Sequence, residues 1–428
     1  MIFKDIKILN KNFEVEDHQN VVVIGEYITY AGPEAQNETG HEVIDGHNKF
    51  LMPAFYNTHC HIAMTLLRGF GEGLPLDRWL NEKVWPFEAK YTANDKYWAA
   101  ALGACELIKS GCVSVTENYF DLPTIAGALH NAGLKANICN PYLVFEEKSF
   151  YDDNSYRDTV NLMNWIKEHD DGRIKADASI HSEYCSTLNG AKEVAEFAKE
   201  YDLIIQAHVS ETQKEQAECI ERNGMTPVQY MYAAGALDQP FIAAHCVWLT
   251  EEDMEIMKNS GAYVSHNPRS NLKLGSGIAP IKTYYEKGMN ITFGTDGASS
   301  NNNLDMLEEI QYGAMLCRGV THDANAIPAS EILRMATQEG AYSQGRFDCG
   351  TLEEGKRADL IMFDLDRPNL QPDYDTVSNI VFAAHSSDIV MTMRDGDVIY
   401  RNGELVHIDE EKVKAEAVES FNRILNSL

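Results

Sequence analysis

The stretch LMPAFYNTHCH, Leu51 to His61, begins as an apolar run and ends in two histidines separated by one residue. On a β-strand, side chains two residues apart point to the same face, so His59 and His61 should converge while Cys60 faces away. Neutral imidazoles placed in this way suit Zn²⁺ or Fe²⁺. His-x-His also occurs in many proteins that bind nothing, so the meaning of the pair depends on where the other histidines fall.

The middle of the chain alternates between two kinds of segment. Segments with helical spacing, such as Lys96–Lys109 and Glu251–Ser260, separate short apolar runs that are typical of buried strands. Eight buried strands alternating with helices is the pattern of a (β/α)₈ barrel. A doubly wound open sheet is the alternative, but no Gly-x-Gly-x-x-Gly follows a strand to support it. The eight runs are Leu51–His59, Gly111–Glu117, Leu134–Asn140, Ile174–His181, Leu203–His208, Phe241–His245, Ala262–His266 and Asn290–Asp296.

The two ends of the chain differ from the middle. Residues 1–50 and the segments 358–366 and 389–406 are rich in Val, Ile and Tyr, with Asp-Gly and Asn-Gly pairs typical of hairpin turns. We therefore expect residues 1–52 and 350–407 to form one small β domain, with the barrel at 53–349. The last segment, 408–428, has apolar residues at helical spacing and predicts a helix docked on the protein.

The net charge and the residue composition limit the partners and the cellular location that we expect. The formal net charge is −29, which argues against nucleic acid or an anionic membrane as a partner. No apolar run approaches the roughly 20 residues of a membrane span, and the first residues lack the pattern of a signal peptide. Nine cysteines without CxxC pairs fit reduced thiols. We expect a cytoplasmic protein.

Polar residues end every one of the eight predicted strands. In a barrel of this kind the active site lies where the carboxyl ends of the strands meet. A single histidine there is more often a hydrogen-bonded structural residue than a ligand, but so many imidazoles at one end of a barrel make a purely structural role improbable. The strand-end residues are His59 with His61, Glu117, Asn140, His181, His208, His245, His266 and Asp296.

Four of these residues form a plausible ligand set for one divalent ion. His59, His61 and His208 with Asp296 give three imidazoles and a carboxylate, which leaves a position open for water. Asp296 precedes Gly297, so a turn-capping role is an alternative. Glu211, three residues beyond His208, is close enough to reach a metal-bound water as a proton carrier. A Glu after a strand often simply starts a helix, so its position alone decides little.

The sequence resembles the amidohydrolase superfamily, and within it the methylthioadenosine/S-adenosylhomocysteine deaminases. The resemblance covers about residues 52 to 366 and includes long uninterrupted blocks. The blocks are PAFYNTHCHIAMTLLRG, LPLDRWLNEKVWPFE, HSEYCS, HVSET, AAHCVWL, VSHNPRSNLKLGSGIAPI, GTDGASSNNNLDMLEE and GTLEEGKRADLIMFD.

This resemblance implies a barrel carried with a β-sandwich, and hydrolytic deamination of adenosine-type nucleosides. It also implies one divalent metal ion, Zn²⁺ in the first place and Fe²⁺ as the alternative, on the four ligands above. Glu211 would shuttle the proton, His245 would orient or polarise the water, and Asp296 would share in deprotonating it. Members with two metals usually bridge them with a lysine at the end of strand four, where this chain has His181.

The same resemblance assigns substrate contacts to His181, to Ser300 and to Glu88, which would bind the ribose hydroxyls. Similar enzymes that accept S-adenosylhomocysteine hold its carboxylate with arginines from the loop after strand three. Here that loop reads NPYLVFEEKSFYDDNSYRDT, where only Lys148 and Arg157 are cationic. We therefore expect Arg157 as the candidate contact and uncharged 5′ groups as the better substrates.

Two other readings use the same residues. A pterin, guanine or triazine deaminase, or a chlorohydrolase, could act through the same metal ligands on another heterocycle. A non-catalytic barrel is the other alternative, although such a protein would be expected to lose ligands. A small-molecule substrate is the expected partner, and a homo-oligomer is common among similar proteins. Glu117 and His266 are assigned no role.

Overall fold

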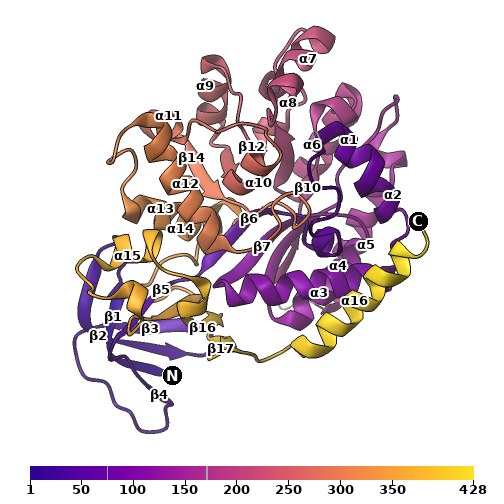
Figure 1. Ribbon diagram of the computed structural model, residues 1–428. Coiled ribbons are helices and arrows are strands. Elements are labelled where there is room, and N and C mark those ends of the chain that lie inside the picture. The colour runs from indigo at the N-terminus through magenta and orange to yellow at the C-terminus, as the bar shows by residue number, and fades with distance from the viewer. Residues whose placement is uncertain (75, 170–171) are drawn as a thin grey trace.

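A computed structural model describes residues 1–74, 76–169 and 172–428 (Figure 1). At its centre the described strands form a parallel (β/α)₈ barrel, with one of the eight positions divided between two short strands. Hydrogen-bonded ladders join them into one group of four strands and one of five. The strands are β6 (Phe55–Cys60), β7 (Cys112–Asn118), β8 (Lys135–Cys139), β9 (Ile174–Ala176), β10 (Ala178–Ser179), β11 (Ile205–Val209), β12 (Phe241–His245), β13 (Tyr263–His266) and β14 (Asn290–Phe293).

Hydrogen bonds outside the two ladders join the groups of strands. At one junction the Asp177 N–H donates to the Ile138 carbonyl at 2.9 Å. At the other, between β14 and β6, the Asp296 N–H donates to the His59 carbonyl at 2.9 Å. A Cβ atom on Gly294 would lie 2.8 Å from the His59 nitrogen, so only glycine allows the two backbones to approach this closely. The first and last strands of the barrel therefore meet at the histidine motif.

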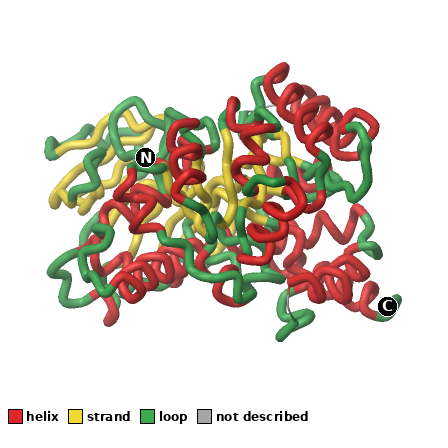
Figure 2. Tube along the Cα trace, turned by 90° about the horizontal axis from the view of Figure 1, so that it is seen from above, coloured by secondary structure: helices red, strands yellow, loops and turns green. Residues whose placement is uncertain are grey.

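Helices cover the outside of the barrel, and Figure 2 shows them around the central strands. Several begin with a Thr whose hydroxyl accepts the N–H three residues on, as Thr212 does in α7. The longer helices are α3 (Ala93–Lys109), α4 (Leu122–Ala132), α5 (Asn154–His169), α6 (Leu188–Tyr201), α7 (Gln213–Asn223), α9 (Glu251–Ser260) and α12 (Met306–Thr321). The shorter ones are α8 (Pro227–Ala233), α10 (Pro268–Lys273), α11 (Ile281–Lys287), α13 (Ala329–Ala336) and α14 (Gln338–Ser343).

Both ends of the chain enter one further sheet, to which nine described strands belong. The antiparallel pairing of β5 with β15 joins the two ends, with Leu51 opposite Met362. Buried residues such as Phe3, Leu51 and Met362 form a hydrophobic cluster separate from that of the barrel. The strands are β1 (Ile2–Leu9), β2 (Val15–Ile24), β3 (Tyr27–Gly32), β4 (Val43–Asp45), β5 (Lys49–Pro53), β15 (Leu360–Asp364), β16 (Ile389–Arg394), β17 (Asp397–Arg401) and β18 (Glu404–Leu405).

The hydrogen bonds of this second sheet are continuous. The expected sandwich of two packed layers stays a prediction, and so do the domain limits at 52/53 and 349/350. The small helix α15 (Thr376–Phe382) packs between the sheet and the barrel helices α12 and α13. In the ranges that the structure describes, no helix combines the length and apolar character needed to cross a membrane.

The last helix, α16 (Glu410–Leu425), lies along α3 on the barrel wall (Figure 1). Its Val413 is buried against Ala101 and Cys105. The Lys109 ammonium lies 2.6 Å from the Glu410 carboxylate, and Arg423 forms an ion pair with the buried Asp95. An apolar stripe and two ion pairs therefore hold the end of the chain on the barrel.

Candidate metal-dependent active site

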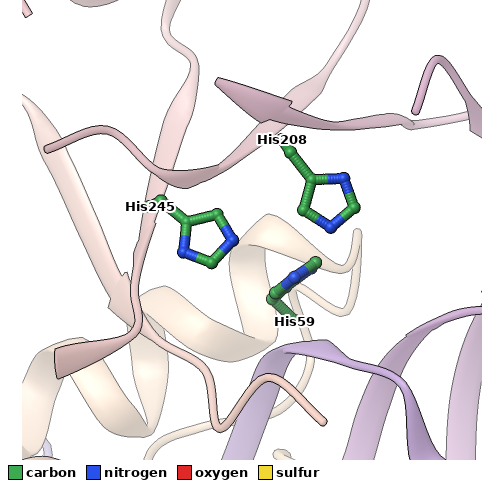
Figure 3. Close-up of side chains that lie close together, drawn as sticks. All are labelled: His59, His208 and His245. Carbon is green, nitrogen blue, oxygen red and sulfur yellow. The ribbon is translucent and has the colours of Figure 1, made fainter. Parts of the chain in front are cut away.

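The histidine cluster lies at the carboxyl ends of the barrel strands. Figure 3 shows His59, His208 and His245 from three different strands with their rings turned toward one another. The ring centroids of His59 and His208 are 4.9 Å apart, and those of His59 and His245 are 5.4 Å apart. Strand β6 ends at Cys60, so His61 lies one residue beyond it, and its ring is 4.9 Å from that of His59. The structure brings together the residues that the sequence grouped.

Backbone carbonyls fix the orientation of two of these rings. Nδ1 of His61 lies 2.6 Å from the Asn118 carbonyl, and Nδ1 of His208 lies 2.8 Å from the His181 carbonyl. Because a carbonyl can only accept, each Nδ1 carries the proton and each Nε2 has a free lone pair. These two Nε2 atoms face each other at 3.2 Å. Two lone pairs at this distance repel unless a cation lies beside them.

Asp296 completes this group from the loop after β14. Its Oδ1 is 3.4 Å from Nε2 of His61 and 3.6 Å from Nε2 of His59. Its Oδ2 accepts hydrogen bonds from the hydroxyls of Ser270 and Ser300, at 2.5 and 2.8 Å. The Gly297 N–H donates to Oδ1 at 2.8 Å, so the turn-capping contact considered for Asp296 is also present.

The backbone at the site is held in an uncommon conformation. Ser210, His245 and Asp296 have φ angles of 51°, 73° and 58°, in the left-handed region that residues with a side chain rarely adopt. Such strain is concentrated at functional sites, where the surrounding structure enforces it. Ser210 directly follows β11, His245 is the last residue of β12, and Asp296 lies three residues beyond β14.

The residues present fit a divalent cation. Nε2 of His59 is buried, and it has no hydrogen-bond partner among the residues that the structure describes. Burial lowers the pKa of His59 to about 4 and that of His208 well below its usual value, so both imidazoles are neutral, as metal ligands must be. Burial opposes ionisation of Asp296, but the neighbouring imidazoles of His59, His61 and His245 hold the pKa of this carboxyl well below its usual value.

The ligand atoms form two overlapping triads. His59, His61 and Asp296 make one, and His59, His208 and His245 make the other, with the atoms of each triad within 4.8 Å of one another. His245, which the resemblance predicted to orient or polarise the water, therefore lies among the predicted ligands.

Glu211 lies beside His245. Its Oε2 is 3.8 Å from Nε2 of His245, and its Oε1 accepts a hydrogen bond from the Ser276 hydroxyl at 2.9 Å. The Nδ1–H of His245 donates to the Asn271 side-chain oxygen at 2.9 Å, which leaves Nε2 directed toward Glu211. Burial lowers the pKa of His245, but the negative charges of Glu211 and Asp296 outweigh burial and raise it.

A cleft opens onto these groups. His181, Glu211, Asp296 and Ser300 line it beside the histidines. Glu88 also lines the cleft; it is the last residue of α2 (Trp85–Glu88) and accepts a hydrogen bond from the Tyr119 hydroxyl. Burial raises the pKa of Glu88 to about 7.

Residues 50–399 match the amidohydrolase family over most of the chain. The chain belongs to the amidohydrolase family. A 5-methylthioadenosine/S-adenosylhomocysteine deaminase of Dictyoglomus thermophilum is 40% identical over 375 residues, which are 88% of this amidohydrolase and 87% of the relative. A 5′-deoxyadenosine deaminase of Methanobrevibacter smithii is 36% identical over 428 residues, with 99% and 98% of the two chains covered.

Solved structures share the fold of this amidohydrolase. An adenosine deaminase from Xanthomonas campestris with bound zinc has a TM-score of 0.92 and 28% identity, and the match covers 99% of this chain and 98% of that one. A zinc complex of atrazine chlorohydrolase from Arthrobacter aurescens has a TM-score of 0.90 at 20% identity, covering 98% and 99%. The second likeness concerns the fold alone.

Three strand-end or loop residues lie away from the cleft of the amidohydrolase. Arg157 is not among the described residues that line it; its exposed guanidinium donates to the Asp152 carbonyl at 3.1 Å. Both carboxylate oxygens of Glu117 accept the Ile62 N–H, at 2.9 and 2.8 Å, and so brace the backbone just after His61. The ring of His266 is buried against Phe293.

Sequence reasoning missed the residues that hold the functional groups in place. Ser270, Asn271 and Ser276 contact Asp296, His245 and Glu211, and all three lie in the block VSHNPRSNLKLGSGIAPI. That block marked the family without showing which side chain each residue would meet. Tyr119, one residue beyond β7, carried no signal that linked it to Glu88.

Proposed function

We propose that this amidohydrolase hydrolytically deaminates adenosine-type nucleosides, including 5′-methylthioadenosine, S-adenosylhomocysteine, 5′-deoxyadenosine and adenosine. The products are ammonia and the inosine analogue. The observation that carries the proposal is the arrangement around Nε2 of His61 and His208, which lie 3.2 Å apart with the Glu211–His245 pair beside them. The names of its relatives at 36–40% identity support this class of substrate.

The proposed cofactor is one divalent ion, Zn²⁺ first and Fe²⁺ as the alternative, held by His59, His61, His208 and Asp296. When bound, such an ion lowers the pKa of a coordinated water toward about 7 and so supplies the nucleophile. His181 at the end of the fourth strand position, where a bridging lysine would be needed for a second ion, supports a single ion.

Proton transfer is assigned to Glu211. Its carboxylate accepts the proton of the attacking water, passes it to the ring nitrogen beside the reacting carbon, and then assists the departure of ammonia. The Ser276 hydroxyl holds one carboxylate oxygen, so the other stays directed toward His245. Asp296 shares in taking the proton, and His245 orients the water through Nε2, because Asn271 already holds its Nδ1–H.

Substrate contacts are assigned to three residues that line the cleft. Glu88 accepts hydrogen bonds from the ribose hydroxyls, and His181 and Ser300 are further substrate contacts; all three line the cleft. Arg157 is left out of this assignment, because its guanidinium is held on the Asp152 carbonyl. We further propose that the enzyme works in the cytoplasm without nucleic acid or membrane partners, in keeping with its charge of −29, and that it forms a homo-oligomer.

Ammonia release from a panel of amines tests the proposal. The panel contains adenosine, 5′-methylthioadenosine, free adenine, guanine, a pterin and an aminotriazine, each assayed with the zinc-loaded enzyme. The nucleosides should have the highest kcat/KM, and free adenine should be poor because it lacks the ribose that Glu88 contacts. Faster turnover of guanine, the pterin or the triazine would contradict the nucleoside assignment.

A further inference from the structure

A second hollow opens from the side of the cleft, and we call it the outer pocket. It is lined by Trp85, Phe120, Asn140, Pro141, Leu143, Phe145, Asp153 and Asn154. The outer pocket adjoins the cleft, since both are lined by Trp85, Phe120, Pro141 and Leu143. Trp85 lies three residues before Glu88 on α2, which places the entrance of the outer pocket beside the proposed ribose contact.

The wall of the outer pocket is mostly apolar and aromatic. The rings of Trp85 and Phe145 make an edge contact, with centroids 6.2 Å apart. Phe145 is 69% exposed and Phe120 is 38% exposed, so both offer apolar surface that the protein itself does not cover. An aliphatic group that enters here from the cleft would bury this surface, at about 25 cal/mol for each Å².

Cationic side chains are missing from this region. Among the described residues that line the cleft and the outer pocket, none is Lys or Arg. The one charged group on the wall of the outer pocket is the carboxylate of Asp153, which Lys148 contacts at 2.6 Å. Burial opposes its ionisation, but the hydrogen bond from Lys148 lowers the pKa of Asp153, so it stays charged.

Three cations that could serve a carboxylate at this end of the barrel already have partners. Lys148 is paired with Asp153, and Arg157 donates to the Asp152 carbonyl. Arg269 forms an ion pair with Glu308 and lies over the Tyr312 ring at 5.2 Å. A carboxylate that entered the outer pocket would therefore lose water and find no Lys or Arg among the described lining residues, while the one cation at its wall, Lys148, is already paired with Asp153.

Because the outer pocket shares four lining residues with the cleft, we propose that it receives the 5′ substituent of the nucleoside and selects an uncharged aliphatic thioether over one that ends in an amino acid. This proposal rests on the proposed function and specifies the substrate class. It predicts that 5′-methylthioadenosine and longer 5′-alkylthioadenosines are better substrates than S-adenosylhomocysteine. A missing charge-assisted hydrogen bond corresponds to roughly a ten- to hundredfold difference in kcat/KM.

Four nucleosides distinguish the effect of the length of the 5′ substituent from the effect of its charge. The kcat/KM values of adenosine, 5′-methylthioadenosine, 5′-butylthioadenosine and S-adenosylhomocysteine are compared with the zinc-loaded enzyme. The butylthio compound has a chain similar in length to that of S-adenosylhomocysteine but without its charges. It should match or exceed 5′-methylthioadenosine, whereas S-adenosylhomocysteine should be at least tenfold poorer. Equal or better turnover of S-adenosylhomocysteine overturns the proposal, while failure of all four compounds contradicts the proposed function instead.

A gain-of-charge variant tests the location. Phe145→Arg places a guanidinium on the rim of the outer pocket at an exposed position, so the fold should tolerate it. The ratio of kcat/KM for S-adenosylhomocysteine to that for the butylthio compound should rise about tenfold. Tyr151→Arg, on the same loop but outside the lining, is the matched control and should leave the ratio unchanged. An equal rise in both variants would assign the effect to net charge and overturn the location.

Discussion

At the scale of single residues, Glu211 is the side chain whose role in proton transfer can be tested separately from metal binding. It lies at the cluster without belonging to either ligand triad. Glu211→Gln should keep the metal and the fold, while kcat falls by about 10²-fold or more, because the amide cannot accept the proton. Metal analysis and steady-state kinetics on the same preparation check both parts.

Two further variants control this experiment. Glu218→Gln makes the same change on the surface of α7 and should leave kcat within twofold. Ser276→Ala removes the hydroxyl that holds Oε1 of Glu211 and should lower kcat by about tenfold with the metal content unchanged. Near-normal kcat in the Glu211→Gln enzyme would mean that another group carries the proton.

Glu88 predicts a pH dependence. Burial raises the pKa of its carboxyl to about 7, so it is neutral below this pH and charged above it. A carboxylate accepts hydrogen bonds from hydroxyls more strongly than the neutral acid does. The kcat/KM for adenosine should therefore rise as the pH increases through about 7, and the ratio of wild type to Glu88→Gln should show this step.

The same raised pKa affects stability in the opposite direction. A carboxyl whose folded pKa lies above its unfolded value stabilises the fold below the unfolded pKa and loses that contribution as the pH rises through about 7. Glu88→Gln should thus raise the Tm relative to wild type more at pH 8.5 than at pH 5.5. A wild-type-to-variant ratio of kcat/KM that is flat with pH, together with an unchanged Tm difference, would contradict the assignment.

The residue scale also shows where sequence reasoning stops. His59, His61, His208 and Asp296 could be grouped because each follows a strand-like run, and a barrel forces all strand ends to one rim. The roles of Ser270, Asn271 and Ser276 could not be predicted, since they depend on how one loop folds over the rim. The assignment of Arg157 rests on loop position alone and stays a prediction; its guanidinium donates to the Asp152 carbonyl, five residues before it.

At the scale of elements, α16 offers a test with an internal control. Val413 is 1% exposed against α3, whereas Val418 on the same helix is 58% exposed. Val413→Ala should lower the free energy of unfolding by about 1–3 kcal/mol through lost burial and the remaining cavity. Val418→Ala should stay within about 0.5 kcal/mol.

Denaturant unfolding measures both α16 variants. Similar losses for the two would mean that the helix does not dock through Val413. The spacing of apolar residues was enough to predict this helix and its buried side, because the 3.6-residue period places Val413, Ala417 and Ile424 on one face. The ion pair between Arg423 and Asp95 was not predictable, since it joins residues 328 positions apart.

Strand limits were harder to predict than strand order. The run Ile174–His181 proved to be two short strands interrupted at Asp177, whose buried carboxylate accepts hydrogen bonds from Asn137 and Gln206. Strand β14 ends at Phe293, three residues before Asp296. The contacts of Asp177 join segments far apart in the chain, and the local sequence carries no sign of them.

At the scale of the whole molecule, the metal ion should stabilise the folded protein and should also be required for activity. Purified enzyme should contain about one equivalent of metal, and a chelator should lower the Tm because the ion binds only the folded state. The His59→Ala variant should lose metal and activity. His47 is an exposed histidine of the β domain, and the His47→Ala variant should lose neither. Two equivalents that are both needed for turnover would contradict the single-ion assignment.

The pairing of β5 with β15 joins two strands that the ribosome makes at very different times. The two strands are separated by about 300 residues, and at roughly 5–20 residues per second a ribosome needs about 15–60 s to supply the second after the first. Throughout this interval the apolar strand at Lys49–Pro53 has an unpaired edge, which can pair with a neighbouring nascent chain. Chaperone capacity during translation, more than the final stability of the fold, should therefore set the yield of this protein.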